Sequence, residues 1–209
     1  MTSAQVNALG TGLLAFLALW GTVLVPQLII QRARFGRFLP GRIATTAALL
    51  CYACLTLAVV LLPLPGPNAH RLVQTIQLTP FQWITDVRTD RVAPGLWHSI
   101  TTTAFEQMAL NVLLFVPLGI FARMLWRRGL VGTTLLGFAC SLAIELTQLT
   151  ANWGTAPFQY RIFDVDDLIT NTTGAALGWI AGALLLALRA SAVPAQTARR
   201  ERIHLTQTR

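Results

Sequence analysis

Five long apolar stretches dominate this sequence, and they constrain its fold more than any motif does. The core of a bilayer is about 30 Å thick, and an apolar helix of about 20 residues crosses it. The stretches have that length and run over Leu9 to Ile30, Ile43 to Leu64, Met108 to Trp126, Gly129 to Leu149, and Leu168 to Leu188. Only 11% of the residues are charged, whereas a soluble domain has about 25%. The sequence therefore predicts an all-α integral membrane bundle of about five transmembrane helices.

The distribution of arginine predicts the orientation of these helices. The chain has 16 basic residues, all of them Arg, and a net charge of +8. Twelve lie at the end of the first, third or fifth stretch or after it: Arg32, Arg34, Arg37, Arg42, Arg123, Arg127, Arg128, Arg189, Arg199, Arg200, Arg202 and Arg209. Basic residues beside membrane spans stay mostly on the cytoplasmic side, so we expect the N-terminus outside and the C-terminus in the cytoplasm. No tract combines basic and aromatic residues as a nucleic-acid site does, so no nucleic-acid partner is predicted.

Four segments follow from this pattern. Residues 1–64 form two N-terminal transmembrane helices with a basic cytoplasmic loop, and residues 65–105 form an extracytoplasmic loop. Residues 106–190 form a core of three transmembrane helices, and residues 191–209 form a basic cytoplasmic tail. We expect the tail to lie near anionic lipid without a fold of its own.

Polar residues gather near the predicted outer ends of the last three spans. They are Asn111, Glu145, Gln148, Asp164, Asp167 and Asn171. An ionisable side chain inside a span is costly unless it is paired, so Glu145 in particular indicates a function or a partner. Together these residues predict a partly enclosed pocket that opens to the outer surface.

Spacings of three and four residues place several polar and small residues on one face of the last helix. This stripe consists of Asp164, Asp167, Asn171, Gly174 and Gly178, whereas Asp166 is expected to point elsewhere. Gly174, Gly178 and Gly182 form a run of small residues that lets a neighbouring helix approach closely. The stripe is therefore expected to face the bundle.

Structural roles for the same residues remain open. Asp164 precedes a helix, where an aspartate caps free backbone amides and is favoured by the helix dipole. Arg161 is a candidate partner for Glu145 or Asp164 in a structural salt bridge. Asn111 either joins two helices by a hydrogen bond or contacts a ligand.

Three blocks of the sequence carry a family resemblance. They are NVLLFVPLGIFARML from Asn111, SLAIELTQL from Ser141 and RIFDVDDLITNTTGAALG from Arg161. These blocks resemble the VanZ-like family, which is named for a protein linked to teicoplanin resistance. The matching positions are Asn111, Phe115, Pro117, Gly119, Glu145, Gln148, Arg161, Asp164, Asp167, Asn171, Gly174 and Gly178. The resemblance covers residues 76–188.

The resemblance implies a small multi-pass protein of the bacterial cytoplasmic membrane. Some family members are associated with reduced susceptibility to glycopeptide antibiotics, and the resemblance implies no mechanism for this. Pro117, Gly119, Gly174 and Gly178 are expected to pack helices.

Two classes of function are compatible with the sequence. The first is a protein that binds an envelope lipid or a cell-wall precursor at its outer leaflet without catalysis. In that case Arg161 would pair with a phosphate, whereas Asn111, Gln148 and Asn171 would contact amide or hydroxyl groups. The sequence leaves the oligomeric state open.

The second class is an intramembrane enzyme that acts on a lipid-linked phosphate or sugar. Here Glu145, Asp164 and Asp167 would hold a divalent cation through hard oxygen ligands, or one of them would be a general acid or base. The sequence does not decide whether a reaction is catalysed or whether a cation binds.

Overall fold

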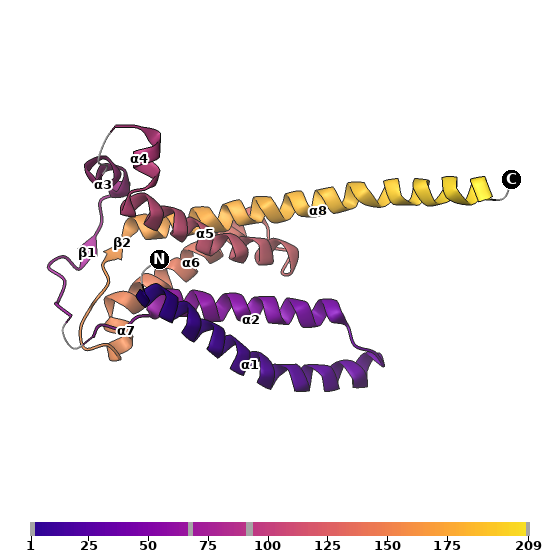
Figure 1. Cartoon of the computed structure of the whole chain (residues 1–209), viewed down its shortest axis with the longest axis horizontal. Helices are drawn as coiled ribbons and strands as arrows, with labels where there is room; N and C mark the ends of the chain where they lie inside the picture. Colours follow the sequence, from indigo (N-terminus) through magenta and orange to yellow (C-terminus); the bar gives the residue numbers. More distant parts are fainter. Residues whose placement is uncertain (1–2, 67–68, 91–93, 208–209) are drawn as a thin grey trace. The chain divides into compact units, whose positions relative to one another are not determined.

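The computed structural model describes residues 3–66, 69–90 and 94–207, with side chains from residue 6 to residue 192 of these ranges. The elements, shown in Figure 1, are α1 (Ser3–Phe35), α2 (Pro40–Leu61), β1 (Ile76–Gln77), α3 (Gln82–Asp90), α4 (Leu96–Ile100), α5 (Thr103–Met124), α6 (Leu130–Leu149), α7 (Ala151–Gly154), β2 (Phe163–Asp164) and α8 (Val165–Gln207). The regular secondary structure of the described residues is helical apart from the two short strands. The strands pair in parallel, with Ile76 opposite Phe163 and Gln77 opposite Asp164.

Five helices are long and apolar enough to cross a membrane, which confirms the predicted number of spans. These segments are Val6–Phe35, Pro40–Leu61, Thr103–Met124, Leu130–Leu149 and Val165–Ala192. The sidedness of the helices stays a prediction. The tail differs from expectation, because α8 continues as a helix to Gln207, in keeping with its many Ala, Arg and Gln residues, which favour helix.

The chain packs as two compact units. The first unit contains Met1–Thr75 and Leu146–Ile162, and the second contains Ile76–Glu145 and Phe163–Arg209. Within the first unit α1 packs against α2. A Cβ atom added at Gly12 of α1 would lie 2.9 Å from the Cβ of Ala58, so this contact requires a residue without a side chain.

The second unit is built on α5 and α8, which run alongside each other (Figure 1). Their backbones approach so closely that a Cβ at Gly174 would lie 2.2 Å from the Val112 carbonyl oxygen, and one at Gly178 would lie 2.0 Å from that of Val116. Glycine is the residue that permits such an approach between membrane helices. The glycines predicted to pack helices therefore lie at the α5–α8 contact.

Gly119 and Pro117 of α5 belong to the same helix pair. A Cβ at Gly119 would lie 2.0 Å from the carbonyl oxygen of Ala175 in α8. Pro117 lies inside α5 and is half-buried. Such a proline is tolerated in a membrane helix because neighbouring groups satisfy the backbone carbonyl that it frees.

Candidate functional site

The N-terminus of α8 is capped by Asp164. Its Oδ1 atom accepts a hydrogen bond from the backbone amide of Asp166 at 2.8 Å. An aspartate at this position satisfies one of the amides that have no partner inside the helix. The capping interpretation of Asp164 thus has its expected hydrogen bond, and the residue's second carboxylate oxygen is a further acceptor.

Glu145, near the end of α6, is 1% exposed. Its Oε2 atom accepts a hydrogen bond from the backbone amide of Asp164 at 3.0 Å. The burial of this carboxylate is compensated in part by a backbone donor. Glu145 therefore fixes the position at which β2 ends and α8 begins.

Asp166 has partners that are distant in sequence, and it lines the same cavity as the stripe residues Asp164 and Asp167. Its two carboxylate oxygens accept the backbone amides of Phe81 at 2.5 Å and Trp83 at 3.1 Å, at the N-terminus of α3. Asp166 is 5% exposed. It therefore caps a helix other than its own and anchors the start of α3 to α8.

Asp167 joins three helices of the second unit. Asn111 of α5 donates from Nδ2 to the Oδ1 atom of Asp167. Ser141 of α6 donates to the Asp167 carbonyl oxygen at 3.4 Å, and Asn171 Nδ2 donates to Ser141 Oγ at 2.9 Å. Ser141 and Asn171 are buried, and the Oδ1 atom of Asn171 has no hydrogen-bond partner. Asn111 thus has the helix-joining contact that was one of its two predicted roles.

A cavity of about 50 Å³ lies beside this network. It is lined by Trp83, Asp86, Ala104, Gln107, Met108, Asp164, Asp166, Asp167 and Thr170. Of the residues predicted to bind a ligand, Asp164 and Asp167 line the cavity. Asn111 and Glu145 do not line it but hydrogen-bond to these two aspartates. Asn171 hydrogen-bonds to Ser141.

The cavity is acidic, and this affects the ionisation of Asp164. Burial raises the pKa of Asp164, and the negative charges of Asp166 and Asp86 raise it further. The hydrogen bond from the Asp166 amide opposes this by lowering the pKa. Because the first effect is the largest, Asp164 holds a proton to a higher pH than an exposed aspartate does.

The side chains of Gln148 and Arg161 contact the end of α2 in the first unit. Gln148 Nε2 donates to the Val60 carbonyl oxygen at 3.0 Å. Arg161 Nη2 donates to the carbonyl oxygens of Val59 and Leu62 at 3.1 Å and 3.0 Å. A cation at this end of a helix is also favoured by the helix dipole.

Two further side chains bind the carbonyl that lies between these. Tyr160 Oη donates to the Leu61 carbonyl oxygen at 2.7 Å, and Asn152 Nδ2 contacts the same oxygen at 3.4 Å. The last carbonyls of a helix have no partner within it. The C-terminal end of α2 is therefore capped by four side chains of the segment 146–162, which gives two of the predicted site residues a structural role there.

Metal binding would require several ligands to converge. Within the described ranges, no three His, Cys, Asp or Glu side chains are grouped in a way that would hold a metal ion. Asp166, which lines the cavity, directs both carboxylate oxygens to backbone amides. The divalent cation that the sequence allowed has no preformed ligand set among these residues.

Comparison with known proteins identifies the family. Residues 49–186, more than half of the chain, match the VanZ/LLP1 family. The chain belongs to the VanZ/LLP1 family. No curated protein and no solved structure matches it. The family match confirms the resemblance of the three sequence blocks, and with the five apolar helices it makes the protein a VanZ-like multi-pass membrane protein.

The family segment begins within α2 and so includes more of the chain than the sequence blocks indicated. It contains both the α2 carbonyls and the side chains that cap them. Sequence reasoning did not place Asp86, Ser141 or Asp166 in the site. Ser141 was detectable, because it lies four residues before Glu145 and hence on the same face of α6.

Proposed function

We propose that this VanZ/LLP1 protein binds an envelope lipid or a cell-wall precursor in the bacterial cytoplasmic membrane, through the acidic cavity of the second unit. The observation that carries the proposal is the set of four aspartates that line a cavity of about 50 Å³. Small-molecule sites usually have volumes of about 300 to 1,000 Å³. The cavity would therefore receive only a small polar group, such as a hydroxyl or amino group, and the rest of the molecule would lie outside it.

The chemistry of the lining supports a ligand that donates hydrogen bonds. Ionised carboxylates only accept hydrogen bonds, so they select hydroxyl, amide N–H or ammonium groups. An ammonium group would in addition offset the repulsion among the aspartates. Cell-wall precursors and amino-bearing envelope lipids carry such groups, and a protein that retains them would change the susceptibility of the cell to glycopeptides such as teicoplanin.

The surrounding hydrogen bonds support a preorganised site. Asn111 contacts the carboxylate of Asp167, and Glu145 contacts the backbone of Asp164. Side chains held by such contacts lose little freedom when a ligand arrives. Gln148 and Arg161 are not part of the proposed ligand set, because they bind the end of α2 in the first unit.

A second candidate function is favoured by the raised pKa of Asp164. A carboxyl group with a raised pKa holds its proton to a higher pH and so acts as a general acid more readily than an ordinary aspartate. Asp164 lines the cavity, where it would protonate the leaving oxygen of a lipid-linked phosphate or sugar. This is the enzyme alternative, and it uses the same cavity.

The proposal is tested by native mass spectrometry of the full-length protein purified from membranes in mild detergent. The test variant is Asp86→Asn, because Asp86 lines the cavity, and the matched control is Asp90→Asn on the same helix, which is exposed and does not line it. We expect a bound envelope lipid or precursor in wild type and in the control, with its occupancy reduced about tenfold in the test variant. Equal occupancy in all three proteins would contradict the proposal.

The two candidate functions differ in the fate of the ligand. If the protein only binds, the extracted molecule is unchanged after incubation, and expression of Asp164→Asn retains any effect on teicoplanin susceptibility. If it is an enzyme, a cleaved product accumulates with wild type and is absent with Asp164→Asn, although the ligand still binds.

A further inference from the structure

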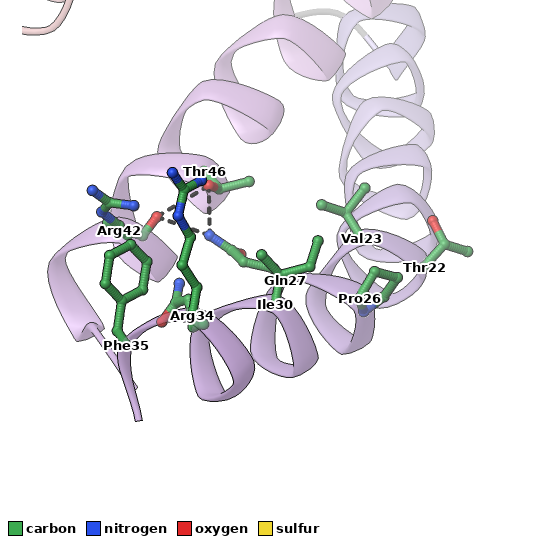
Figure 2. Close-up of a pocket in the computed structure, with 10 residues that line it drawn as sticks. Thr22, Val23, Pro26, Gln27, Ile30, Arg34, Phe35, Arg42 and Thr46 are labelled. Carbon is green, nitrogen blue, oxygen red and sulfur yellow. Dashed lines mark hydrogen bonds between the residues drawn. The ribbon is translucent and has the colours of Figure 1, made fainter. Parts of the chain in front are cut away.

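A second and larger cavity lies in the first unit, between α1 and α2, next to the arginine-rich connection that joins them (Figure 2). Its volume is about 430 Å³, within the range of about 300 to 1,000 Å³ found for small-molecule sites. It is lined by Thr22, Val23, Pro26, Gln27, Ile30, Gln31, Arg34, Phe35, Arg42 and Thr46. None of these residues belongs to the acidic cavity of the second unit.

The cavity is polar at one end and apolar at the other. Val23, Pro26 and Ile30 lie on the part of α1 that precedes its basic end, and α1 changes direction near Pro26 in Figure 2. Arg34 and Arg42 lie at the opposite end, on either side of the helix connection. A proline inside a helix is a common cause of such a bend. The cavity therefore suits a molecule that has a charged head and an apolar tail.

Phe35 holds the two arginines at the polar end. The guanidinium carbon of Arg42 lies 4.7 Å from the centre of the Phe35 ring, and that of Arg34 lies 5.9 Å from it. Both distances are typical of cation–π contacts. Figure 2 shows Arg34 extending from α1 toward Thr46 of α2. The two positive charges are thus brought to one end of a single cavity.

Two glutamines clamp α1 to α2 and each keeps one polar atom without a partner. Gln31, which is 3% exposed, accepts the Leu39 amide at 2.7 Å through Oε1, and its Nε2 group has no hydrogen-bond partner. Gln27 donates to Thr46 Oγ1 at 2.9 Å, and its Oε1 atom has none. A buried donor without a partner is destabilising, so a ligand that accepts a hydrogen bond from it is favoured. Gln31 therefore places an unsatisfied N–H donor at the wall of a cavity that also contains two cations.

The charge balance of the first unit indicates what satisfies these groups. Residues 1–85 and 146–162 contain no Asp and no Glu. Arg34 and Arg42 consequently have no carboxylate partner within their own unit. A phosphate supplies the missing negative charge, since guanidinium groups bind its oxygens by charge-assisted hydrogen bonds.

We propose that the α1–α2 cavity binds the phosphate headgroup of an anionic phospholipid. Arg34, Arg42 and the Nε2 group of Gln31 would bind the phosphate, and the start of an acyl chain would lie against Val23, Pro26 and Ile30. The apolar part of the cavity favours a lipid over a soluble anion. Its lining residues Val23, Pro26 and Ile30 belong to α1, which is long and apolar enough to span the membrane. The headgroup would belong to the leaflet on the arginine-rich side, which the positive-inside rule predicts to be cytoplasmic.

The test measures the thermal stability of the full-length protein in detergent as phosphatidylglycerol, phosphatidylcholine or inorganic phosphate is added. The test variants are Arg34→Gln and Arg42→Gln, and the matched control is Arg37→Gln, which removes one charge from the same connection without touching the cavity. We expect phosphatidylglycerol to raise the Tm of wild type and the control at the same concentration, and the test variants to need about tenfold more. Phosphatidylcholine and inorganic phosphate should have little effect.

Two results would overturn the proposal. The first is an equal response of all four proteins to phosphatidylglycerol, and the second is a response to inorganic phosphate as large as that to the lipid. Gln31→Glu provides a separate check if an arginine variant does not fold, because glutamate keeps the acceptor for Leu39 and replaces the donor that faces the phosphate. A wild-type lipid response in Gln31→Glu would also overturn it. All these variants leave the acidic cavity unchanged, so the result is independent of the proposed function.

Discussion

The backbone amide of Asp164 donates a hydrogen bond to the Oε2 atom of Glu145, and the donor and acceptor atoms are 3.0 Å apart. This contact ties the buried end of α6 to the residue that caps α8, and Asp164 in turn accepts the amide of Asp166. The backbone of Asp164 therefore donates to the carboxylate of Glu145, while the carboxylate of Asp164 accepts from the backbone of Asp166. A carboxylate that is 1% exposed is thereby placed where a backbone group offsets part of its desolvation.

Removal of the Glu145 carboxylate is expected to destabilise the protein. Glu145→Ala leaves the Asp164 amide without its acceptor, at a cost of about 1 to 3 kcal/mol. Glu145→Gln retains an acceptor oxygen and should cost less. The measurement is Tm in detergent, with Glu106→Gln as the control because Glu106 is exposed. A Glu145→Ala variant as stable as this control would show that the hydrogen bond contributes little.

Replacement of Asp166 is expected to loosen α3. Both carboxylate oxygens accept amides at the start of that helix, and loss of a helix cap costs about 0.5 to 2 kcal/mol. Asp166→Ala should therefore speed hydrogen exchange in a peptide that covers residues 79–90, whereas Asp166→Asn, which keeps one acceptor, should have a smaller effect. Asp90→Asn is the control. Unchanged protection of that peptide in Asp166→Ala would exclude the anchoring role.

Arg161 provides a test of the α2 cap. If its role is to donate to the carbonyls of Val59 and Leu62, then Arg161→Lys should keep nearly wild-type stability, because an ammonium group also donates and carries the same charge. Arg161→Ala should lower stability by about 1 to 3 kcal/mol. Tm and hydrogen exchange at the end of α2 measure the effect. If Arg161→Lys folds normally but binds less envelope lipid or precursor than wild type in native mass spectrometry, Arg161 instead recognises a ligand bidentately.

The sequence predicted those features that depend on local periodicity. The lengths of the apolar stretches specified the five long helices. The spacing of Asp167, Asn171, Gly174 and Gly178 specified the face of α8 that meets α5 and, through Asn171, α6. A helical repeat determines which residues share a face regardless of the rest of the fold. The polar stripe could therefore be predicted from the sequence alone.

Contacts that depend on the path of a loop could not be predicted from local periodicity. The segment between α6 and α8 has no periodicity, and Ala151, Asn152 and Trp153 have positive φ values that residues other than glycine rarely adopt. Arg161, in this segment, binds a carbonyl at the end of α2 that lies 99 residues earlier in the chain, and Gln148, at the end of α6, binds one 88 residues earlier. Asp166 likewise has partners more than eighty residues away, and no local pattern indicates such a pairing.

The α5–α8 contact should tolerate no side chain at Gly178. A Cβ there would lie 2.0 Å from the Val116 carbonyl oxygen, so Gly178→Ala must push two backbones apart. Overpacking of this kind costs about 1 to 3 kcal/mol or more. Gly132→Ala in α6 is the control, because its Cβ would meet its nearest neighbour at 3.9 Å. Tm values in detergent compare the two, and equal values would mean that the helices do not approach as closely as described.

The pH dependence of stability is expected to depend on Asp164. Burial raises the pKa of its carboxyl above the ordinary value of 3.8, so ionisation is less favourable in the folded protein than in the unfolded chain. The stability that the protonated form contributes is fully present below pH 3.8 and is lost as pH rises through the higher folded pKa. Asp164→Asn is neutral at every pH and keeps an acceptor oxygen for the Asp166 amide. It should therefore have a higher Tm than wild type at pH 7, and the difference should shrink as the pH is lowered toward 4. Asp90→Asn, at an exposed position, should show no such trend, and a pH-independent difference for Asp164→Asn would mean that burial does not shift this carboxyl.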